Sequence, residues 1–105
     1  MVTVITSTGD NVNSQFDLRF GRASHFCIIN EDTKEIYFVE NENKNAQGGA
    51  GTKTTEKMIE LGAKKIISGD FGPKAKEMLE KFNIQMVIFN DDSQTIQNII
   101  DKINS

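Results

Sequence analysis

The chain has 105 residues, 37% hydrophobic and 26% charged with a net charge of −3, which predicts one soluble globular domain over residues 1–105. It lacks the basic excess of nucleic-acid binders, and no run approaches the roughly 18 apolar residues of a membrane span. One cysteine excludes an internal disulfide, and the N-terminus resembles a strand more than a signal peptide, so we expect a cytoplasmic protein.

The first third of the chain is predicted to form three strands. Val2–Ser7 is β-branched and alternating, and His25–Asn30 and Glu35–Glu40 are separated only by the polar connector Glu31–Lys34. Because so short a connector joins antiparallel strands, this third is predicted to be a meander.

The middle of the chain begins with Asn41–Gln47, an asparagine- and lysine-rich loop that we expect to be the most mobile segment. A helix from about Ala50 to Leu61 follows, with Gly62 suited to the position after its end. Lys65–Ser68 is predicted as a strand, and a second helix begins at Pro73, a residue favoured at the first helical position.

The last third adds one strand and one helix. Met86–Phe89 is a continuous apolar run, typical of a strand buried on both faces. A third helix is predicted from about Ser93 as N-cap, with an isoleucine stripe at helical spacing. This order predicts an α/β fold: a five-stranded mixed sheet, in which an antiparallel meander feeds parallel βα units, with helices on both faces.

Two glycine-rich junctions precede the first two helices. They are Gly48-Gly49-Ala50-Gly51 and Gly69-Asp70-Phe71-Gly72-Pro73. In a parallel sheet both junctions open on the same edge, and the first amides of a helix lack internal partners and carry partial positive charge. We therefore hypothesise a backbone cradle for an anion, although Asp70 would repel one. The plainer alternative is two ordinary strand-to-helix turns, since neither spacing matches a Walker A or dinucleotide motif.

Few side chains stand out as ligands. Arg22, in the loop Phe20–Ala23, offers a planar guanidinium for phosphate, carboxylate or sulfide-rich anions, with Arg19 as a second candidate and a surface salt bridge as the plainer role. His25 and Cys27 share one face of a strand, so they are candidate metal ligands, or an edge histidine beside a core cysteine, which we favour. A single cysteine and a single histidine cannot form a tetrahedral metal site within one chain.

Catalysis has little support in the sequence. No nucleophile–base constellation is present, and a two-metal nuclease needs several carboxylates where only Asp10 and Asp70 fall near strand ends. Two non-enzymatic functions are left: a carrier of an anionic metal–sulfur cargo, and a regulatory or interaction module for a phosphate-bearing small molecule or a partner protein at the same edge.

Several short motifs recur in an order known from one family. They are Ser7 with Gly9, Phe20-Gly21-Arg22-Ala23, Asn41, Gly48-Gly49-Ala50-Gly51, Gly62, Gly69 and Gly72-Pro73. From Val2 to about Phe89 the chain resembles the dinitrogenase iron–molybdenum cofactor biosynthesis family, which comprises small NifX-like and NifB C-terminal-like domains. It departs from some cluster-binding relatives, which have a histidine around the element Gly48-Gly49-Ala50-Gly51, where this chain has Gln47.

The resemblance implies a ribonuclease-H-like fold without nuclease activity, in a protein related to nitrogen fixation. It also implies that the chain binds an iron–sulfur or iron–molybdenum cluster precursor, for storage or for delivery to cofactor-assembly proteins. By position, the implied pocket residues are Arg22, Gly48, Gly49, Ala50, Gly51, Gly72 and Pro73. We expect a monomer or a weak homodimer, with no nucleic-acid or membrane partner.

Overall fold

The computed structural model describes residues 1–104, which form one five-stranded sheet in the order β3-β2-β1-β4-β5. The strands are β1 (Val2–Ser7), β2 (His25–Asn30), β3 (Glu35–Glu40), β4 (Ala63–Ser68) and β5 (Gln85–Ile88). β2 is antiparallel to both β1 and β3, whereas β1, β4 and β5 run parallel. The predicted meander and the predicted parallel units are both confirmed, and β1 joins them at the centre of the sheet.

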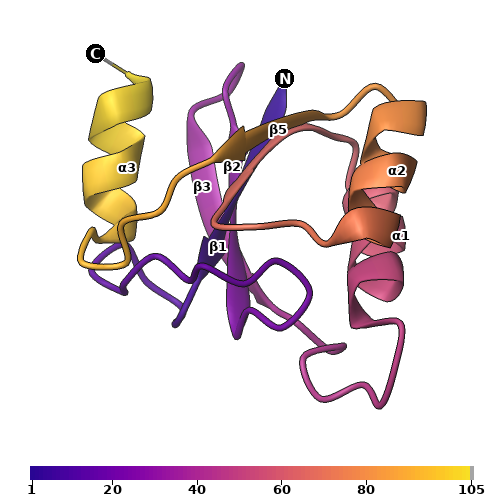
Figure 1. Cartoon of the computed structure of the whole chain (residues 1–105). Coiled ribbons are helices and arrows are strands. Elements are labelled where there is room, and N and C mark those ends of the chain that lie inside the picture. Colours follow the sequence, from indigo (N-terminus) through magenta and orange to yellow (C-terminus); the bar gives the residue numbers. More distant parts are fainter. Residues whose placement is uncertain (105) are drawn as a thin grey trace.

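Three helices cover the two faces of this sheet, with α1 (Ala50–Glu60) and α2 (Pro73–Lys81) on one side and α3 (Ile96–Ile103) alone on the other (Figure 1). Among residues 1–104, no helix combines the length and the apolar character that crossing a membrane requires. The helices follow the expected signals, since α1 and α2 begin at their glycine junctions and the isoleucine stripe of α3 is buried.

Each face of the sheet has its own hydrophobic core. Because successive side chains of a strand point to opposite faces, neighbouring residues enter different cores. Val4, Phe26 and Ile66 pack under α1 and α2, whereas Ile5, Cys27 and Ile67 pack under α3.

Two sequence predictions about the last third are wrong. β5 is the edge strand of the sheet, and Ile88 is 62% exposed, so this strand is not buried on both faces. α3 begins at Ile96 with Thr95 as its N-cap, two residues later than the cap expected at Ser93. The hydroxyl of Ser93 instead donates to Asp91 within the preceding turn.

Candidate functional site

The segments that the sequence singled out meet at one edge of the sheet. The chain leaves β1 and β4 at their carboxyl ends, which lie side by side because the two strands are parallel neighbours. A hollow of about 390 Å³ opens there, which we call the glycine hollow. Its lining residues are Gly21, Arg22, Gly49, Ala50, Gly51, Thr52, Asp70, Phe71, Gly72, Pro73, Lys74 and Ala75.

The start of α1 forms one wall of the glycine hollow. Its N-cap, Gly49, has a φ of 68°, a left-handed conformation that glycine adopts without the penalty that a Cβ brings. The helical bonds begin with Lys53, whose amide donates to the carbonyl of Gly49 at 2.9 Å. No side chain among residues 1–104 caps the amides that precede it. The first turn of α1 therefore offers backbone donors at the wall.

The start of α2 forms the opposite wall in a similar way. Gly72 has φ 71° and ψ 157°, a combination that is open essentially only to glycine, and Pro73 then sets the first helical φ. This helix also begins without a side-chain cap from the described residues, unlike α3, where Thr95 Oγ1 accepts from the Asn98 amide at 3.1 Å. Both helix starts at the hollow are thus uncapped, and the helix away from it is capped.

Close contacts hold the three segments of the hollow together. The rings of Phe20 and Phe71 lie 5.2 Å apart between centroids, which joins the arginine loop to the second glycine junction. A Cβ added to Gly21 would come within 2.8 Å of the Gly51 amide nitrogen, so the loop lies directly against the start of α1. A Cβ on Gly51 would in turn lie 3.5 Å from that of Ala75 on α2.

Arg22 lies at the rim of the glycine hollow, and part of its hydrogen-bonding capacity is already used. Its Nη1 donates to the carbonyl of Lys44 at 3.0 Å and to that of Ala46, which holds the asparagine-rich loop close by. The buried Asn41 reinforces this arrangement by donating to the Gly21 carbonyl at 3.0 Å. Gly48 lies in the same loop between β3 and α1 but does not line the hollow.

The charges around the glycine hollow are mixed. Arg22 and Lys74 are exposed cations in its lining, and the exposed Asp70 opposes them, as the sequence suggested. Neither α1 nor α2 has an acidic residue in its first turn, although acidic residues are favoured there. The backbone amides thus keep their partial positive charge available to a ligand.

Neither His25 nor Cys27 lines the glycine hollow. Cys27 is fully buried in the core under α3, the placement that the sequence favoured, and burial raises the pKa of its thiol to about 12. A thiol with so high a pKa stays protonated at neutral pH and is a poor metal ligand. His25 is partly exposed, with Nδ1 2.7 Å from the hydroxyl oxygen of Ser24. Within residues 1–104, no group of three or more His, Cys, Asp or Glu side chains could hold a metal ion.

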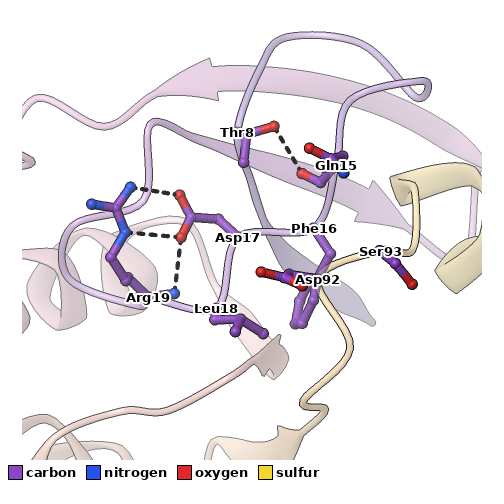
Figure 2. Close-up of a pocket in the computed structure, with 8 residues that line it drawn as sticks. All are labelled: Thr8, Gln15, Phe16, Asp17, Leu18, Arg19, Asp92 and Ser93. Atoms are coloured by element: carbon purple, nitrogen blue, oxygen red, sulfur yellow. Dashed lines mark hydrogen bonds and ion pairs between the residues drawn. The ribbon is translucent and has the colours of Figure 1, made fainter.

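A second hollow, of about 480 Å³, lies between the loop after β1 and the turn before α3 (Figure 2). Asp17 is buried and accepts from Nε of Arg19 at 3.1 Å and from its Nη2 at 3.0 Å. This bonding raises the pKa of the Arg19 guanidinium, first through the hydrogen bond and then through the charge of Asp17. Arg19 therefore lines this second hollow and does not line the glycine hollow. Sequence reasoning did not identify Asp17, since a lone aspartate in a loop carries no signal of burial.

Comparisons with known proteins identify a matching family model and a related sequence. The family model described as dinitrogenase iron-molybdenum cofactor matches residues 1–105. An uncharacterized protein of Methanocaldococcus jannaschii is 29% identical over 84 residues, which span 77% of this chain and 71% of that protein.

Two solved structures are similar over 98% of this chain and 86% of their own length. The apo form of the orange protein from Desulfovibrio gigas has a TM-score of 0.89 at 24% identity, a likeness of fold alone. A candidate NifB protein from Thermotoga has a TM-score of 0.82 at 27% identity. With the family model matched over its whole length, the chain belongs to the dinitrogenase iron-molybdenum cofactor family.

Proposed function

We propose that this protein is a non-enzymatic carrier of an anionic metal–sulfur cluster or iron–molybdenum cofactor precursor, which it binds in the glycine hollow. The proposed binding residues are Arg22, Gly48, Gly49, Ala50, Gly51, Gly72 and Pro73. Gly48 contributes as part of the turn that leads into α1, and the others line the hollow itself.

One observation carries the proposal: two uncapped helix starts and an arginine line the same hollow. A sulfide-rich cluster is a large anion, and unpaired helix amides together with a guanidinium are suited to negative charge. Such a site recognises the charge and hydrogen-bonding surface of its cargo and does not need cysteine or histidine ligands.

The space at the glycine hollow fits a cargo that approaches the backbone closely. A Cβ added to Gly49 or to Gly72 would meet none of the described atoms within 4 Å, so both glycines face open space. Larger side chains there would project into that space and shield the amides. Because the described residues offer no metal-binding side-chain cluster, we infer that the metal arrives preassembled with its sulfide.

The same proposal extends to the fold family of the protein and to its cellular setting. The ribonuclease-H-like assignment is supported by the strand order 3-2-1-4-5, in which only β2 runs against the other strands. A carrier of this kind receives its cargo from one assembly protein and releases it to another, in the cytoplasm. Backbone donors suit that role, because they bind without a covalent metal–ligand bond that would have to be broken on release.

Anaerobic reconstitution with iron, sulfide and molybdate tests the carrier function. We expect visible charge-transfer absorption that stays with the protein through gel filtration. Arg22→Ala removes charge-assisted hydrogen bonds worth about 1.5–3 kcal/mol, so retention of the cluster falls by roughly ten- to a hundredfold.

The matched control is Lys64→Ala, which removes one positive charge from an exposed side chain near the start of β4. The glycine hollow lies at the other end of this strand. Its cluster retention stays at the level of the unmodified protein. A protein that stays colourless, but whose melting temperature rises with nucleotides, contradicts the carrier and indicates the regulatory module instead.

A further inference from the structure

The outer edge of β5 has backbone groups without partners in the sheet. The Phe89 amide donates to the Ser68 carbonyl at 3.0 Å, and Ser68 is in register with Ile88. In a parallel ladder, alternate residues bond to the same neighbour, so Val87 and Phe89 face β4. The N–H and C=O groups of Met86 and Ile88 therefore point away from the sheet.

This edge lacks the features that normally discourage pairing. Residues 84–89 contain no charge and no proline, and Ile88, at 62% exposure, is the most exposed large apolar side chain in residues 1–104. Natural sheets usually protect an edge with charges, prolines or a covering segment. An edge strand this apolar is a site where another strand adds to the sheet.

The other edge strand of the sheet, β3, is protected against pairing with a copy of itself. β3 begins with Glu35 and ends with Glu40, so an antiparallel copy of β3 in full register would place the two glutamates opposite each other. Like charges directly opposite destabilise strand pairing. The two edges of one sheet thus differ in their capacity for self-association.

A hollow of about 450 Å³ lies beside β5, with Met86 and Ile88 in its lining. Its other lining residues are Asp70, Phe71, Gly72, Pro73 and Lys76, the first four of which also line the glycine hollow. A strand added at β5 would therefore lie next to the second glycine junction, with room for an apolar side chain beside Ile88.

We propose that β5 pairs with β5 of a second copy of this chain, antiparallel about Val87. Met86 of one copy then pairs with the partner's Ile88, and Ile88 with the partner's Met86, which gives four backbone hydrogen bonds and covers both exposed isoleucines. The pairing stops there, because the Ile84 amide already donates to the Leu79 carbonyl at 2.9 Å.

Charge complementarity favours this occupant over an unrelated strand. In the antiparallel arrangement, the residues that precede β5 in one copy approach those that follow β5 in the other. Lys81, at the end of α2, is exposed and so is Asp92, beyond β5. Each copy thus brings a cation to the partner's acidic turn, and the strand between them has no charge to repel its equivalent.

Sedimentation velocity tests the pairing. So short an edge buries less than a standard interface, and weak association calls for concentrations from about 10 µM to about 1 mM. We expect the sedimentation coefficient to rise from that of the monomer toward that of the dimer. Ile88→Lys puts two like charges diagonally across the paired strands and removes the apolar side chains that the pairing covers, so it weakens dimerisation at least tenfold, whereas Ile36→Lys on β3 leaves it unchanged.

Lys81→Asp, which reverses one charge of the proposed ion pair, weakens dimerisation by roughly two- to fivefold, and Lys81→Asp with Asp92→Lys restores it. Ile88 and Ile36 are both substantially exposed, so neither lysine disturbs the core. A protein that remains monomeric over the whole range overturns the inference, as does equal weakening by Ile88→Lys and Ile36→Lys. The proposal does not depend on the cargo, so its failure would leave the carrier function standing.

Discussion

Two buried threonines of β1 differ in how well their hydroxyls are satisfied. The Thr6 hydroxyl donates to the Asp17 carbonyl and shares a hydrogen bond of 3.0 Å with the Ser68 hydroxyl, whereas the Thr3 hydroxyl is buried without a partner among the described residues. We expect Thr3→Val to raise the free energy of unfolding by about 1 kcal/mol, because the unsatisfied hydroxyl is removed and the shape is kept. Urea unfolding measures the change.

The matched control is Thr6→Val, which makes the same chemical change on the same strand. It removes a hydroxyl that takes part in two buried hydrogen bonds, so we expect a loss of about 1–3 kcal/mol of stability. A Thr3→Val protein that is destabilised as much as the control would show that the Thr3 hydroxyl has a partner, such as a buried water.

The buried thiol of Cys27 predicts a pH dependence of stability. Its pKa rises from an ordinary value of 9.0 to about 12 in the folded protein. Between these two values the folded state keeps a proton that the unfolded state loses. The contribution of the buried thiol to the free energy of unfolding is therefore complete below pH 9.0 and is lost as the pH rises toward 12. Cys27→Ala should flatten the decline of the free energy of unfolding across that window. Identical slopes in the two proteins would contradict the assignment.

At the scale of elements, the start of α3 provides a test of capping. Thr95 Oγ1 accepts from the Asn98 amide at 3.1 Å, and Thr95→Ala should lower the free energy of unfolding by about 1 kcal/mol. Ser93→Ala, which alters the residue that the sequence favoured as cap, should cost less, because Ser93 bonds only within the exposed Asp91 turn. Thermal unfolding of both proteins ranks the two positions, and the reverse ranking would place the cap at Ser93.

Most elements could be predicted because their signals are local. The glycine and proline signals located the starts of α1 and α2, and the isoleucine stripe identified α3. The position of β5 could not be predicted in the same way. A continuous apolar run describes a strand that contacts apolar surfaces, but whether it lies at the centre or the edge depends on how many strands the whole sheet has. The cap of α3 was missed because serine and threonine are similar caps, and only the turn at Asp91 decides between them.

At the scale of the whole molecule, topology accounts for how much of the candidate site could be predicted. Parallel pairing of β1 and β4 follows from the predicted element order, and it brings the arginine loop and the second glycine junction to one edge. The second hollow with Asp17 and Arg19 depends on how a long loop folds back beneath α3. Loop paths of that kind are set by tertiary contacts and leave no periodic pattern in the sequence.

The convergence of three segments on the glycine hollow makes Gly21 a position that does not tolerate a side chain. A Cβ there would lie 2.8 Å from the Gly51 amide nitrogen and 3.1 Å from the Ala50 carbonyl carbon, both of which are backbone atoms. Gly21→Ala must therefore move the arginine loop away from the start of α1, and we expect a loss of about 1–3 kcal/mol of stability. Cluster retention should fall as well, since Arg22 moves with the loop.

Gly48→Ala is the matched control for stability, because a Cβ at that position meets none of the described atoms within 4 Å. A substitution at so open a site should change stability by no more than about 0.5 kcal/mol. Thermal unfolding compares the stabilities of the two variants. Anaerobic reconstitution of Gly21→Ala then shows whether the clash also lowers cluster retention. If Gly21→Ala is as stable as Gly48→Ala and retains as much cluster as the unmodified protein, the tight contact between the arginine loop and α1 is not what shapes this site.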